Sequence, residues 1–278
     1  MLYGVALGQT VHYYRSFPTD HKWIKSLVAF VLVAETLQQV LIVHSQWRYV
    51  VVRCIGVTAP CVKDSWSIVF QTCPSTLIFL TVQLFYISKI WKFGQHRMSI
   101  FLIICSLISA GSSIAFMILE WLLQVDVPQD WRKGKMATAT LLTISGLHTA
   151  VTDVGITVIM CRWLYKSSRD VTQVHRSLTL RIIKYFVASG MFSSCTTAAF
   201  LIAFWVSPGS MGWIATYFVG SKGYSNSMLA LLNNRKVMRS KLRLADKSLV
   251  TSPELHEAQN HHLRECASLP ASHWGIAV

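Results

Sequence analysis

Long apolar segments separated by short polar ones set the pattern of this chain. Five segments of at least 18 residues are nearly free of Asp, Glu, Lys and Arg: Ser26–Val43, Ser65–Ser88, Ser99–Leu119, Met136–Cys161 and Tyr185–Ser221. The first contains one charged residue, Glu35, and the fourth contains one, Asp153. Because a helix of about 18 or more apolar residues spans a hydrocarbon layer of about 30 Å, the pattern predicts several membrane-crossing helices.

We predict seven helices from these segments and their flanks. The expected bounds are Met1–Tyr14, Lys25–His44, Trp66–Lys89, Ser99–Leu123, Ala137–Arg162, Arg181–Trp205 and Met211–Leu232. The last apolar segment is too long for one crossing, and the run Ser207-Pro208-Gly209-Ser210 divides it because Pro and Gly together favour a turn. The expected fold is therefore all-α, a bundle of seven transmembrane helices.

The first predicted helix is the shortest. Its 14 residues rise only about 21 Å, which is less than a full crossing. A cleaved signal peptide would begin with basic residues, and Met1–Thr10 contains none. We interpret this segment as a span whose outer part is missing or unusually short.

Composition supports the membrane assignment. Hydrophobic residues make up 53% of the chain and charged residues only 14%, whereas soluble domains average about 25% charged residues. A soluble globular protein is therefore excluded.

The basic residues gather on one side of the predicted helices. Of the 26 Lys and Arg, 19 fall after the first, third and fifth helices or in the C-terminal tail, and six fall in the other loops. Since Lys and Arg are retained on the cytoplasmic side, the N-terminus is predicted outside and the C-terminus inside. The net charge of +14 then reflects topology, and we expect no nucleic-acid partner. We favour the plasma membrane over an internal membrane.

The composition changes after Asn234. We predict a transmembrane domain over residues 1–234 and a cytoplasmic tail over residues 235–278 that is first basic and then disordered. The stretch Arg235–Lys247 either contacts anionic lipid of the inner leaflet, where each basic residue contributes about 1 kcal/mol, or only anchors the topology.

Several local motifs carry a family resemblance. They are Leu2-Tyr3-Gly4-Val5 in the first helix, Gln83-Leu84-Phe85-Tyr86 in the third, Trp163-Leu164-Tyr165 after the fifth and Ser221-Lys222-Gly223-Tyr224-Ser225-Asn226-Ser227 in the last. With them, Met1–Arg239 resembles a fungal, mostly basidiomycete, seven-helix membrane family that carries domain of unknown function 6534. The resemblance implies the seven-helix fold and brings no activity with it.

Three ionisable residues lie within predicted spans: Glu35, Asp153 and Lys222. Such groups cost about 2.5–3.5 kcal/mol each and often mark functional sites, so we expect an Asp153–Lys222 or a Glu35–Lys222 pair. The pair either fixes helix register or belongs to a ligand or ion site. A Lys222 Schiff base with retinal is disfavoured because the third helix lacks a carboxylate.

Other polar and small residues also repeat within the spans. Tyr224 and Asn226 belong to a polar stripe in the last helix, which favours interhelical hydrogen bonds over a conformational switch. Gly190, Ser194 and Ala198 recur every four residues, a pattern that favours packing within the bundle over homodimerisation.

Pro74 should bend the third helix. The hydroxyls of the flanking Thr72 and Thr76 are expected to satisfy the carbonyl oxygens that the proline frees.

A receptor-like or sensory, non-enzymatic role is the first functional hypothesis. The basic inner loop Arg162–Lys184 and the tail would meet a cytosolic protein, although no D-R-Y follows the third helix and coupling to G proteins is unsupported. The alternative is a small-molecule or ion transporter that uses Glu35, Asp153 and Lys222. An intramembrane enzyme is a weaker third hypothesis, because no H-E-x-x-H, G-x-S-x-G or P-loop pattern occurs.

We expect no catalytic, cofactor or metal site. Cys54 and Cys61, in one outer loop, could form a local disulfide.

Overall fold

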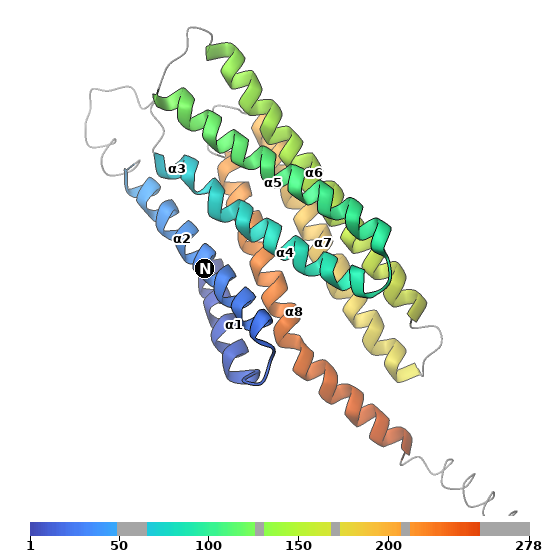
Figure 1. Cartoon of the computed structure of the whole chain (residues 1–278). Helices are drawn as coiled ribbons and strands as arrows, with labels where there is room; N and C mark the ends of the chain where they lie inside the picture. Colours follow the sequence, from blue (N-terminus) through green and yellow to red (C-terminus); the bar gives the residue numbers. More distant parts are fainter. Residues whose placement is uncertain (49–65, 126–130, 168–172, 207–211, 251–278) are drawn as a thin grey trace, which may run out of the picture.

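The computed structural model describes residues 1–48, 66–125, 131–167, 173–206 and 212–250, and all regular elements within them are α-helices (Figure 1). In chain order they are α1 (Leu2–Ser16), α2 (Lys22–Trp47), α3 (Trp66–Phe70), α4 (Thr72–Lys92), α5 (His96–Val125), α6 (Trp131–Ser167), α7 (Gln173–Val206) and α8 (Gly212–Val250). Because α3 and α4 form one interrupted rod, these helices make the seven rods that the sequence predicts.

The rods form a closed ring. Each of α1, α2, α4, α5, α6, α7 and α8 contacts the next, and α1 contacts α8 to complete the circle. The interrupted rod also contacts α6 and α8, because α4 lies toward the middle of the bundle (Figure 1). Following the predicted orientation, we call the end at which α2 ends and α3 begins the outer end, and the opposite end the inner end.

The surface of the bundle is that of a membrane protein. Among the described residues, four rods are long and apolar enough to cross a membrane, and a shorter apolar helix segment covers Gly190–Val206. Large apolar side chains face outward along them, for example Phe101, Leu107 and Val154, each about half exposed. Such a surface requires lipid rather than water around it, so the chain is a multi-pass helical membrane protein.

The third rod breaks one residue after Phe70, as the prediction of a bend at Pro74 implies. Proline has no amide hydrogen, and its ring clashes with the carbonyl of the residue four positions earlier, which here is Phe70, the last residue of α3. The hydroxyl that caps a local carbonyl belongs to Ser75, which donates to Gln71 O (2.9 Å). The prediction that the Thr76 hydroxyl plays this part is wrong, because Thr76 Oγ1 has no partner in the described structure.

The last helix runs further than predicted. It was expected to end near Leu232, but α8 continues through the basic stretch Arg235–Lys247 to Val250. Lys, Arg, Leu and Met are good helix formers, so the charges end the apolar span without ending the helix. Its 39 residues rise about 58 Å, and its final part projects beyond the other helices (Figure 1). Residues 251–278, and Cys54 and Cys61, lie outside the described residues.

Among the residues whose side chains the structure describes, the inner parts of four helices pack together. Ile90, Leu102, Met160 and Leu232, from α4, α5, α6 and α8, are at most 3% exposed and belong to one core cluster.

Candidate functional site

A cavity of about 490 Å³ lies among α3, α4, α5, α6, α7 and α8. It begins near Glu120 and Lys135 at the outer ends of α5 and α6 and extends inward to Gln83 and Ser106 near the middle of the bundle. Small-molecule sites measure about 300–1,000 Å³ and combine apolar walls with a few polar groups. This cavity therefore has the size and the mixed apolar and polar lining of a small-molecule site.

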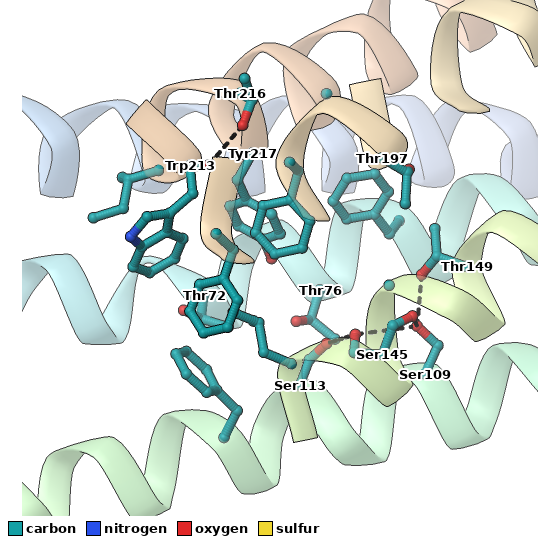
Figure 2. Close-up of a pocket in the computed structure, with 18 of the residues that line it drawn as sticks. Thr72, Thr76, Ser109, Ser113, Ser145, Thr149, Thr197, Trp213, Thr216 and Tyr217 are labelled. Carbon is teal, nitrogen blue, oxygen red and sulfur yellow. Dashed lines mark hydrogen bonds between the residues drawn. The ribbon is translucent and has the colours of Figure 1, made fainter. Parts of the chain in front are cut away.

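One wall of the cavity is a cluster of hydroxyls that joins α5 to α6. Ser109 Oγ donates to Ser145 O (3.0 Å) and lies 2.7 Å from Thr149 Oγ1, while Ser113 Oγ lies 2.5 Å from Ser145 Oγ. Figure 2 shows these four side chains gathered on one side of the cavity. The spacing of the serines by four along α5 places them on the same face of the helix.

The other side of the cavity is aromatic. Trp213 on α8 packs against Phe200 and Phe204 on α7, with ring centroids 6.2 and 5.6 Å apart. Tyr217, one turn further along α8, lies 5.9 Å from the ring of Phe79 on α4. These rings make this side of the cavity aromatic, and Figure 2 shows Trp213 and Tyr217 away from the hydroxyl cluster.

Two lining residues carry buried polar atoms without hydrogen-bond partners in the described structure. They are Gln71 Oε1 and Thr76 Oγ1, on residues that are 3% and 5% exposed. Both lie at the break around Pro74, where the helix leaves its regular course. Buried polar atoms are normally bonded. Because Thr76 Oγ1 lies beside the Tyr217 hydroxyl, Gln71 Oε1 is the atom of the two that is available to a ligand.

Lys222 pairs with Glu35. Lys222 Nζ donates to Glu35 Oε2, and Ser225 Oγ donates to Glu35 Oε1, all three residues being buried. Gln38 Nε2 extends this network to Ser75 Oγ (2.7 Å) and Ser221 Oγ (2.8 Å). The pair thereby joins α2, α4 and α8, but it does not line the cavity.

Asp153 is not part of that pair. Its Oδ1 accepts a hydrogen bond from Gln83 Nε2 (3.3 Å), while Oδ2 is buried without a partner in the described structure. The Ser193 hydroxyl beside it donates to Gly190 O (3.1 Å). Since Gln83 lines the cavity and Asp153 follows the lining residue Thr149 by one turn of α6, the carboxyl lies directly beneath the cavity floor.

The polar stripe of the last helix has two different surroundings. Tyr224 is buried in the core, with its ring 4.9 Å from that of Phe79. Asn226 Nδ2 donates to Leu2 O (3.1 Å) and to Lys222 O (2.7 Å), and so attaches α1 to α8. Of these contacts, the hydrogen bond from Asn226 to Leu2 O joins two helices, and Tyr224 contacts α4 through its ring.

Of the three small residues on α7, Gly190 makes the closest helix contact. A Cβ added to Gly190 would lie 2.0 Å from Thr157 Oγ1 on α6. Ser194 is half-buried and Ala198 is exposed. The stripe therefore does not form one continuous contact within the described bundle.

Sequence reasoning missed the cavity, although part of its signal was present. Ser106, Ser109 and Ser113 recur at helical spacing in α5, and Ser145 and Thr149 do so in α6. Two such hydroxyl stripes in neighbouring helices indicate a polar wall. Their distance from the aromatic rings of α7 and α8 is not encoded in any local pattern.

Comparison with known proteins gives one match. No curated protein and no solved structure matches the chain. Residues 149–237 match a family of unknown function, DUF6534. The matched region includes Asp153 and Lys222 but not Glu35, and the motifs of the first and third helices lie outside it. The resemblance to the DUF6534 family is thus confirmed, with a match that extends from α6 into α8.

Proposed function

We propose that this protein is a receptor-like membrane protein that binds a small molecule in the cavity at the outer end of the bundle. The observation that carries the proposal is a cavity of about 490 Å³ in the outer half above the packed inner parts of α4, α5, α6 and α8. A ligand enters such a site from one side and leaves by the same side. A receptor needs no second opening, whereas a transporter must open the same site to the other side in a second state.

The course of α8 supports the same reading. Trp213 and Tyr217 line the cavity, Lys222 holds α2, and the helix then continues to Val250 at the inner end. A ligand that moves the aromatic rings therefore acts on the element that extends toward the cytosol. Binding shifts a conformational equilibrium only if the ligand contacts differ between the two states, and contact with α8 meets this need.

Cavity-filling substitution tests the binding site. In the full chain in lipid nanodiscs, small alcohols and amines that bind are expected to raise the unfolding temperature by mass action. Ala110→Phe, at a cavity-lining position, should abolish this rise. Ile114→Phe, one turn along α5 and exposed, is the matched control and should preserve it. Equal responses of the two variants would contradict a ligand site in the cavity.

A transporter is the second candidate, because the partnerless carboxyl oxygen of Asp153 lies beneath the cavity floor. Uptake measurements in proteoliposomes distinguish the transporter from the receptor. Under the receptor proposal, a radiolabelled compound that binds in the cavity accumulates no faster than in protein-free liposomes. Faster uptake that is lost in Asp153→Asn would support the transporter instead.

A further inference from the structure

We propose that the cavity selects molecules that donate hydrogen bonds, alcohols or amines on a hydrocarbon skeleton, over molecules of equal size that only accept them. This rests on the proposed function and adds the chemical class of the ligand. The class follows from which polar atoms of the wall remain unused.

Several hydroxyls of the cavity wall already donate hydrogen bonds to backbone carbonyl oxygens of their own helices. Ser106 donates to Leu102 O (2.9 Å), and Thr216 donates to Trp213 O (2.8 Å). A hydroxyl has one hydrogen and two lone pairs, so each of these side chains can still accept a hydrogen bond from a ligand. The same holds for Thr138, which donates to Lys135 O (3.0 Å).

One partnerless atom of the wall points the same way. Gln71 Oε1 is an acceptor only, it is buried, and its residue lines the cavity. Thr76 Oγ1 does not discriminate between ligands, because it lies beside the Tyr217 hydroxyl and a hydroxyl can donate as well as accept. A ligand that donates a hydrogen bond satisfies Gln71 Oε1, whereas an ether leaves this atom unpaired.

The aromatic side of the cavity determines which apolar part the ligand should have. Trp213, Phe200 and Phe204 form an apolar surface of rings that pack edge to face. The complementary molecule is amphipathic, with a ring or chain against these side chains and its donors toward Gln71 and the hydroxyl cluster.

Matched probes test the inference. The probes are alcohols, their methyl ethers and the corresponding amines, each built on phenyl, decalin and steroid skeletons. Equilibrium dialysis measures the affinity of each probe for the full chain in nanodiscs. Empty nanodiscs are the lipid control. On at least one skeleton, the alcohol or the amine is expected to bind roughly tenfold more tightly than the ether. An amine advantage that disappears in Asp153→Asn identifies a cationic ligand, and equal alcohol and amine binding identifies a neutral one.

Two substitutions test whether Gln71 causes the preference for hydrogen-bond donors. Gln71→Met should reduce alcohol or amine affinity roughly tenfold and leave ether affinity unchanged, while Gln39→Met on α2, outside the cavity lining, should change neither. Ethers that bind as tightly as alcohols and amines, with all binding lost in Ala110→Phe, would overturn the inference and leave the receptor proposal intact. Failure of every probe to bind would overturn both.

Discussion

Glu35 and Lys222 place opposite charges at the same depth in the bundle. Each alone costs about 2.5–3.5 kcal/mol in a membrane, and in the structure each neutralises the other, while Ser225 bonds the remaining carboxylate oxygen. Removing one partner of a buried pair is more damaging than removing both, because the remaining charge stays buried and unpaired.

Lys222→Met should therefore lower the free energy of unfolding by about 3–5 kcal/mol. The double variant Glu35→Leu with Lys222→Met should recover most of the loss, because no charge then remains unpaired. Denaturant unfolding of the purified chain in detergent, followed by circular dichroism, measures both changes.

Lys92→Met, at an exposed position of the inner end, is the control and should have little effect. If the double variant is less stable than Lys222→Met, the two residues contribute independently and the pair is not the unit of stability.

At the scale of elements, the contact between α6 and α7 depends on a missing side chain. Gly190 lets Thr157 approach so closely that a Cβ would overlap its hydroxyl oxygen. Thr157 is also held in place, since its Oγ1 donates to Asp153 O (2.8 Å). Small residues at such crossings allow dispersion contacts along the helix backbones.

Gly190→Ala should accordingly destabilise the bundle by about 1–3 kcal/mol, the usual cost of overpacking. Adding Thr157→Ala should restore part of the loss, because it removes the overlapping atoms. Thermal unfolding in detergent micelles provides the comparison.

Gly111→Ala on α5 is the matched control, because nothing lies within 4 Å of a Cβ added there. It should leave stability unchanged or raise it by about 0.5–1 kcal/mol, the helical advantage of Ala over Gly. A Gly190→Ala variant as stable as this control would show that α6 and α7 separate at little cost.

At the scale of the whole molecule, orientation decides which side the cavity faces. The predicted excess of Lys and Arg on the inner side, 19 of 26, places the end of the cavity that Glu120 and Lys135 line on the outer side. A ligand would then reach the cavity from the side opposite the cytosol, and the end of α8 would lie in the cytosol.

Epitope tags at the two chain ends test this orientation. In intact cells, antibody should label a tag before Met1 and should label a tag after Val278 only once the membrane is permeabilised. Labelling of both tags in permeabilised cells is the control. Equal labelling of both in intact cells would contradict an odd number of crossings.

Much of the architecture could be predicted because its causes are local. The length of an apolar segment limits how many times it can cross the membrane, so the seven rods follow from the sequence pattern. The absence of an amide hydrogen at Pro74 is equally local, and it breaks the third rod at Phe70. The predicted end of the last helix, Leu232, lies before the observed end of α8, Val250. Charged residues mark where a segment leaves the membrane, but they do not by themselves end a helix.

The sequence by itself determined the membrane class, the rods and the short set of buried charges, since hydropathy and charge are properties of each segment. Only the tertiary structure decided that Lys222 meets Glu35 rather than Asp153, and that hydroxyls of α5 and α6 face aromatic rings of α7 and α8 across a cavity. Those outcomes depend on the rotation of each helix about its axis and on the spacing between helices. Both are set by contacts between residues far apart in the chain, which no segment encodes alone.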